Sequence, residues 1–164
     1  DGIADSLVAL DTVDESVAKA ILNQAAATNS DLYFVYLATE EGNMYMARGV
    51  TYAAGVDPRE RDWYKQTKSA GHTVVIDPYI SASRPDVVLA TVATPVYFDG
   101  ELVGIVGVDA DIASINEYVE SIDFNNGAYG FLLDSKGDIV ADKNEDYRRK
   151  KLCKGKNGIL HGKS

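Results

Sequence analysis

Residues 57–109 read DPRERDWYKQTKSAGHTVVIDPYISASRPDVVLATVATPVYFDGELVGIVGVD, and this stretch decides how the chain folds. Its second half predicts a long antiparallel hairpin. A strand from Val87 to Tyr97 is followed by the turn dipeptide Asp99-Gly100 and by a return strand from Leu102 to Asp109. Such a hairpin favours an antiparallel sheet.

The first half of this stretch predicts a helix that begins at Asp57. Pro58 suits the first helical position, and Glu60 completes a capping box. Gly71 is typical of the residue just past a helix end. A short strand over His72–Ile76 then leads into the hairpin.

Two further segments are predicted upstream of residue 57. Apolar residues recur at helical spacing from Ile3 to about Ala27, which predicts one continuous helix of about 25 residues, or about 37 Å. This is longer than a small domain needs, although an ordinary amphipathic core helix remains an alternative. Leu32–Thr39 and Met44–Arg48 predict a hairpin.

Downstream of the long hairpin, Ala113–Ser121 predicts a short helix. Residues 129–141 then repeat the pattern of residues 33–46, which is a strand, an acidic turn with glycine, and a second strand. We interpret this as a weak internal repeat whose second copy is incomplete. The basic run over residues 148–156 is typical of a solvated surface.

The order of these elements predicts an α+β fold, with a long N-terminal helix and an antiparallel sheet flanked by helices. The strands do not alternate with helices, which argues against a doubly wound parallel sheet. The chain begins at Asp1 in a segment that already has helical character, so we expect it to be a fragment of a larger protein.

Composition narrows the functional class. The 164 residues carry a formal net charge of −9, which disfavours nucleic acid as a partner because a phosphate backbone would repel the domain. Cys153 is the only cysteine, so no intrachain disulfide is possible. No run of about 18 apolar residues occurs, so no membrane-spanning helix is predicted.

Charged and aromatic residues in residues 57–109 predict a pocket for a small molecule. Asp109 ends a strand whose alternate residues are apolar, so its carboxylate needs a partner such as Arg61 or a ligand ammonium. Arg61 offers a planar fork for a carboxylate, while Trp63, Tyr64 and Tyr79 offer rigid walls with polar tips.

Each of these residues also has an ordinary structural explanation. Asp109 would be solvent-exposed or a helix cap, Arg61 a surface ion pair, and the aromatic residues part of the core. Arg61 and Tyr64 share a helix face, but Trp63 lies about 200° from Arg61 on an ideal helix. Asp111 is expected to cap the helix that begins at Ile112.

Catalytic and metal-binding patterns are absent from the sequence. His72 and His161 lack metal-ligand spacing with Cys153, and no nucleophile elbow, phosphate-binding loop or dinucleotide fingerprint occurs. Residues 134–138 resemble a calcium loop only faintly, because Lys136 replaces an oxygen ligand. We therefore predict no enzyme activity, no metal and no cofactor.

The segments 57–64, 77–79, 94–96, 99–100 and 104–109 occur in an order that resembles the double Cache sensor domains. These are extracytoplasmic, PAS-like ligand-binding modules of chemoreceptors and sensor histidine kinases. The resemblance covers about residues 1–145. It implies a long helix over 1–30, a membrane-distal ligand-binding subdomain over 31–124, and the start of a membrane-proximal subdomain over 125–164.

The resemblance also implies a function. In the amino-acid-binding branch an Arg and a Trp hold the ligand carboxylate, and two Tyr and an Asp hold the amine; the matching positions are Arg61, Trp63, Tyr64, Tyr79 and Asp109. The motif lies at a helix start, which reconciles Trp63 with Arg61. The full-length protein would be a membrane-anchored homodimer that binds an amino acid, amine or small carboxylate outside the cytoplasm.

Two positions depart from that pattern. Val56 replaces an expected Tyr, and Ser81 replaces an expected Asp. Both changes remove polar contacts to a ligand. They support an alternative, which is a structural or protein-interaction domain that has kept the fold and lost the pocket.

Overall fold

The computed structural model describes residues 2–4, 14–123, 128–144, 146, 152–154 and 160–162. The chain divides into two compact units, residues 1–110 and 111–164. The first unit contains α2 (Glu15–Thr28), β1 (Phe34–Thr39), β2 (Met44–Met46), η1 (Ala47–Gly49), η2 (Pro58–Glu60), α3 (Asp62–Ala70), β3 (Val74–Ile80) and β4 (Val88–Phe98). Nearly all of β5 (Glu101–Asp111) also belongs to it.

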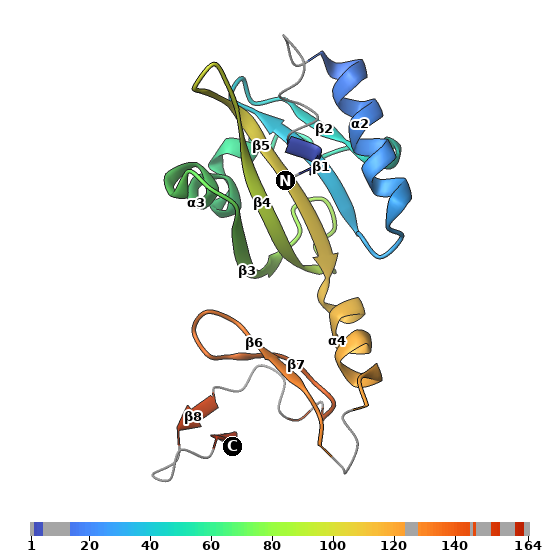
Figure 1. Ribbon diagram of the computed structural model, residues 1–164, viewed down its shortest axis with the longest axis vertical. Coiled ribbons are helices and arrows are strands. Elements are labelled where there is room, and N and C mark those ends of the chain that lie inside the picture. The colour runs from blue at the N-terminus through green and yellow to red at the C-terminus, as the bar shows by residue number, and fades with distance from the viewer. Residues whose placement is uncertain are drawn as a thin grey trace. The chain divides into compact units, whose positions relative to one another are not determined.

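A five-stranded sheet with the order β2-β1-β5-β4-β3 forms the centre of the first unit (Figure 1). β1 pairs antiparallel with β2 and with β5, and β3 pairs antiparallel with β4. The α+β class and the antiparallel sheet predicted from the sequence are therefore confirmed.

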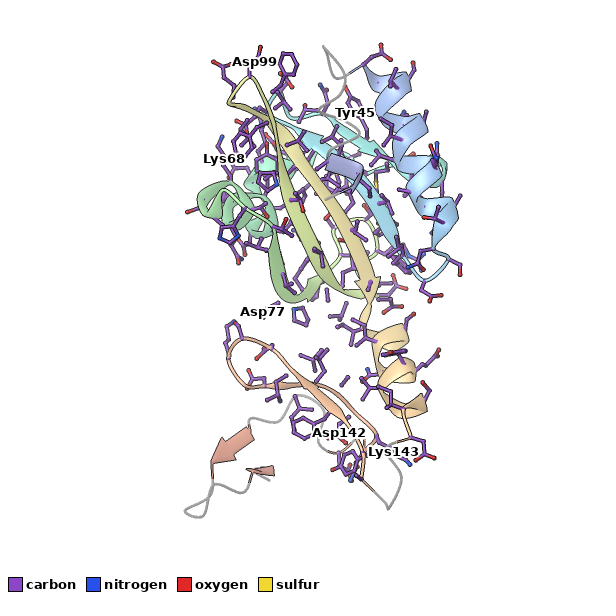
Figure 2. All side chains as sticks on the ribbon, viewed as in Figure 1. Tyr45, Lys68, Asp77, Asp99, Asp142 and Lys143 are labelled. Carbon is purple, nitrogen blue, oxygen red and sulfur yellow. The ribbon has the colours of Figure 1, made fainter. Side chains whose placement is uncertain are left out.

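The long hairpin is formed as predicted. Asp99 and Gly100 both have positive φ, 48° and 84°, which is the geometry of the two-residue turn that matches strand twist. Figure 2 shows Asp99 at the tip of this hairpin. Because β1 pairs with β5, the hairpin occupies the interior of the sheet and provides the scaffold for the polar residues described below.

The prediction of one continuous helix from Ile3 to Ala27 is wrong. Residues 2–4 are helical, but Asp14 has the extended backbone angles φ −70° and ψ 133°. Its carboxylate accepts hydrogen bonds from the backbone N–H groups of Ser16 and Val17, so it caps a new helix, α2. Apolar spacing persists across such a break because it reports which side is buried and not whether the backbone is continuous.

The single helix predicted from Asp57 is also wrong. Asp57 caps only the short 3₁₀ helix η2, through the N–H of Arg59, and no capping box with Glu60 forms. Arg61 is extended (φ −75°, ψ 144°), and α3 begins after it. The predicted end is confirmed, because Gly71 closes α3 in the left-handed conformation.

Alternation along the strands gives the sheet two different buried faces. α2 packs on the face that includes Val35, Leu37 and Val106. Trp63 and Tyr64 of α3 pack on the other face, against Tyr36 and Ile105. Ile105, Gly107 and Asp109 of β5 therefore face the α3 side.

The second unit contains α4 (Ile112–Ser121), β6 (Phe131–Leu133), β7 (Ile139–Asp142), β8 (Leu152–Lys154) and β9 (Leu160–Gly162). Asp111 caps α4 through the N–H of Ala113, as expected. We expected a subdomain boundary near residue 125, whereas the compact units divide after Ala110 because α4 packs on β7.

β6 and β7 pair as an antiparallel hairpin, which matches the strand, turn and strand pattern expected for residues 129–141. Most of the basic run lies outside the described residues. Within the described part of the chain, no helix has the length and apolar character needed to cross a membrane.

Candidate ligand-binding site

The carboxylate of Asp109 is buried on the α3 side of the sheet, with 2% of the residue exposed. Its Oδ1 accepts hydrogen bonds from the Tyr36 hydroxyl at 3.0 Å and from Thr91 Oγ1 at 2.6 Å. Among the described residues, no Lys, Arg or His forms an ion pair with it. Asp109 is therefore a buried acid whose side-chain partners, within the part of the chain that the structure describes, are neutral hydroxyl groups.

Burial raises the pKa of Asp109 to about 6, although the hydrogen bonds from Thr91 and Tyr36 lower it. Near pH 7 the carboxylate is thus mostly ionised, but at a cost in free energy. A cation placed beside it would relieve that cost, and a ligand ammonium group has the required charge.

Tyr36 reaches Asp109 because of a glycine. Tyr36 on β1 lies opposite Gly107 on β5, and an added Cβ at Gly107 would overlap the Tyr36 ring. The ring therefore lies flat over the strand and directs its hydroxyl to Asp109, two residues further along. Burial and the nearby Asp109 charge raise the pKa of Tyr36, so it remains a donor.

Thr91 connects Tyr79 to the same carboxylate. The Tyr79 hydroxyl and Thr91 Oγ1 lie 2.9 Å apart, and Thr91 donates to Asp109. Burial, followed by the charge of Asp109, raises the pKa of Tyr79 to about 12. The three hydroxyl groups of Tyr36, Tyr79 and Thr91 thus form one network around Asp109.

Arg61 lies beside this network without touching Asp109. Its guanidinium donates to the Ile80 carbonyl at 3.2 Å and lies 5.7 Å from the Tyr79 ring centroid, a cation–π distance. The extended backbone at Arg61, between η2 and α3, lets the side chain point toward β3. Arg61 therefore presents a cation that no described carboxylate neutralises.

Trp63 and Tyr64 occupy different positions at the start of α3. The Trp63 ring packs edge-on against Tyr36 at a centroid distance of 5.1 Å and lines the cavity beside Asp109. The Tyr64 hydroxyl instead donates to Glu40 Oε1 at 2.6 Å, and Lys68 holds the other oxygen of Glu40 at 2.5 Å. Figure 2 labels Lys68 on α3. Tyr64 thus supports Trp63 through its ring and is not among the cavity residues.

A small cavity of about 20 Å³ lies beside Asp109, and Arg61, Tyr64 and Thr91 are not among the residues that line it. Trp63, Tyr79 and Asp109 line it, and so does Ser81, one of the two positions that depart from the family pattern. The remaining lining residues are aromatic, apolar or small: Phe34, Tyr36, Met44, Met46, Tyr52, Ala82, Ser83 and Leu89. The cavity in this conformation holds about one water molecule.

A larger hollow of about 430 Å³ lies on the α2 side of the sheet. Its lining comes from residues 2–4, α2, β4 and β5 and includes no charged side chain. Residues 5–13, which follow part of that lining, lie outside the described residues. The larger hollow therefore offers no charged group to an ionic ligand, and the chemistry points to the cavity at Asp109.

Three contributing residues were missed by sequence reasoning, namely Tyr36, Thr91 and Tyr52. Tyr36 and Thr91 belong to predicted strands, but which residue faces which depends on the pairing of β1, β5 and β4. The only available signal was the period of two along each strand. No group of three or more His, Cys, Asp or Glu residues suited to a metal occurs in the described part of the chain.

Comparison with known sequences identifies the family. The family model of the Cache domain, dCache_1, matches residues 3–163. The chain belongs to the Cache domain family. This Cache domain is 34% identical over 134 residues to the methyl-accepting chemotaxis protein McpA of Pseudomonas putida, covering 80% of this chain and 20% of McpA.

Solved structures show the same relationship. The ligand-binding domain of the Pseudomonas aeruginosa amino acid chemoreceptor PctC, in complex with GABA, has a TM-score of 0.78 and 26% identity. That match covers 92% of this Cache domain and 67% of the PctC chain. The domain of PctB with L-Arg has a TM-score of 0.76 and 28% identity, covering 92% and 63%. The chain spans about a fifth of the length of the curated relatives it matches.

Proposed function

We propose that this Cache domain is the extracytoplasmic sensor of a membrane-anchored chemoreceptor and that it binds a small molecule with an amine and a carboxylate. An α-amino acid fits best. The observation that carries the proposal is the buried, ionisable Asp109 facing a cavity beside Arg61. A protein rarely keeps a buried charge without a partner, and here a ligand ammonium would provide one.

The geometry supports a ligand orientation. The ligand ammonium group would pair with Asp109, and its carboxylate would pair with Arg61, which can form two parallel hydrogen bonds. Trp63 and Tyr79 would enclose the carbon atoms between these ends. Tyr64 would act indirectly, by holding Trp63 in place.

Ligand entry requires the cavity to open, because a volume of about 20 Å³ is smaller than any amino acid. The residues Ser81, Ala82 and Ser83 in the β3–β4 loop form part of its wall. We propose that this loop moves outward to admit ligand. The opened and closed packings would then have different affinities for ligand, which is the requirement for transmitting a signal.

The relatives support the remaining features of the proposal. Their names describe methyl-accepting chemotaxis proteins, which favours a chemotaxis output over a histidine kinase. We propose a homodimeric full-length receptor with this domain outside the cytoplasmic membrane. The solved neighbours have GABA, L-Gln and L-Arg as ligands, which supports an amine-bearing ligand here.

Calorimetry against the twenty L-amino acids, GABA and simple organic acids tests the proposal. We expect at least one amine-bearing compound to bind, and we expect Arg61→Ala to weaken its binding by about 10–100-fold through loss of a charged hydrogen-bonded contact. Lys65→Ala is the matched control, because Lys65 is an exposed cation on α3, the helix that follows Arg61, and it pairs with Glu60.

A second function is a structural or protein-interaction domain without a small-molecule ligand. The small volume of the cavity favours this second function. So does Val56, which is apolar where the family pattern has a Tyr. The same calorimetry separates the two, because this function predicts no heat of binding for any compound and equal melting temperatures with and without each compound.

A further inference from the structure

The hydroxyl of Tyr52 is buried and has no hydrogen-bond partner in the described part of the chain. Buried polar groups in folded proteins nearly always have a partner, because an unpaired one loses its bonds to water without replacement. Phenylalanine would fill the same space without this cost. The hydroxyl therefore contributes nothing to the stability of this conformation.

The location of Tyr52 suggests what the hydroxyl is for. Tyr52 lies in the segment between η1 and η2 and lines the same cavity as Trp63, Tyr79 and Asp109. Its ring packs partly buried against the aromatic cluster that contains Tyr36 and Trp63. The ring contacts thus place the phenol at the cavity wall, while its hydroxyl has no hydrogen-bond partner among the described residues.

Two opposite charges act on this hydroxyl. Burial raises the pKa of Tyr52; the Arg61 charge lowers it, and the Asp109 charge raises it. Tyr52 therefore lies within electrostatic range of both ends of the site. A protonated phenol at this position is a hydrogen-bond donor for an anionic group drawn in by Arg61.

We propose that Tyr52 is a specificity-determining residue whose hydroxyl donates a hydrogen bond to the carboxylate of the ligand. This inference rests on the proposed function, because it assumes that the cavity at Asp109 receives a ligand. The ligand carboxylate would then have two contacts, one with Arg61 and one with Tyr52, which lies outside the 57–64 motif. Val56, in the same segment, is apolar and is not among the cavity residues.

The test compares the purified wild-type protein with Tyr52→Phe by calorimetry, using the amino acid from the panel that binds wild type best. We expect a loss of affinity of about 10–100-fold, which is typical of a hydrogen bond to a charged group. The ligand-free melting temperature should stay equal or rise, because the substitution removes an unpaired buried hydroxyl. Tyr118→Phe is the control, since Tyr118 is 69% exposed on α4.

Three outcomes would overturn the inference, and they differ from one another. If wild type binds no compound of the panel, both the proposed function and the role of Tyr52 fail. If wild type binds and Arg61→Ala weakens binding while Tyr52→Phe does not, only the role of Tyr52 fails. If Tyr52→Phe lowers the ligand-free melting temperature by several degrees, the hydroxyl has a structural partner and its role is structural.

Discussion

Replacing Asp109 with asparagine should stabilise the ligand-free protein at neutral pH. The side chain keeps its shape, and Oδ1 can still accept from Tyr36 and Thr91, but the buried charge is removed. Burial raises the pKa of Asp109 to about 6, against about 3.9 in an unfolded chain. At about 1.36 kcal/mol per pKa unit, the ionised carboxylate lowers the free energy of unfolding by about 3 kcal/mol.

The sign of the pH dependence follows from the direction of the shift. The folded state binds the Asp109 proton more tightly, so this group favours folding below about pH 4, and its contribution is lost as the pH rises through about 6. The stability difference between Asp109→Asn and wild type should therefore grow by about 2.5 kcal/mol between pH 4 and pH 7.5. This corresponds to a rise in melting temperature of roughly 5–10 °C.

Urea unfolding of both proteins at several pH values measures this difference. Taking the difference cancels the other carboxylates, such as Asp57 and Asp86, whose pKa values are lowered by Arg59 and Arg84. Asp62→Asn is the control, because Asp62 is exposed at the start of α3, and its difference from wild type should not follow the same curve. A difference for Asp109→Asn that is flat with pH, or that shrinks as the pH rises, would refute the reasoning.

Further substitutions test the scaffold and the site. Gly107→Ala should displace the Tyr36 ring, break its bond to Asp109 and lower the free energy of unfolding by about 1–3 kcal/mol or more, as urea unfolding would show. Asp14→Ala removes the cap of α2 and should cost about 1 kcal/mol in the same assay; no change would mean that the cap is not formed. Tyr64→Phe should change ligand affinity less than about threefold in calorimetry, because the Tyr64 hydroxyl bonds to Glu40 and not to the ligand. A larger loss of affinity would mean that this hydroxyl contacts the ligand.

The hairpins, and with them the antiparallel class of the sheet, could be predicted because they depend on local chemistry. Asp99-Gly100 supports a turn with positive φ at both residues, and the flanking β-branched residues favour strands. Gly71 ends α3 for the same kind of reason, since glycine adopts the left-handed conformation without a steric cost. In each of these places, backbone conformation follows from residues close together in the sequence.

The two helix predictions that were wrong, over residues 3–27 and from Asp57, concern segments whose local sequence signals were ambiguous. Apolar spacing across residues 3–27 looks the same with or without a break, so the cap at Asp14 could be seen only from the backbone angles. At residues 57–64, the proline and acidic residues suit a 3₁₀ turn followed by an α-helix as well as they suit one helix. The extended backbone at Arg61 separates these two alternatives.

Residue types and the family resemblance pointed to Arg61, Trp63, Tyr64, Tyr79 and Asp109 as a candidate site, because an acid, a forked cation and aromatic walls suit a ligand with two charged ends. That assignment stays a prediction. The arrangement of these residues required the pairing of strands that are far apart in the sequence. Tyr36 meets Asp109 across 73 positions, and Thr91 meets it from the neighbouring strand. The register of β1 on β5, together with the missing side chain at Gly107, places these hydroxyl groups on one carboxylate, and no local pattern contains that information.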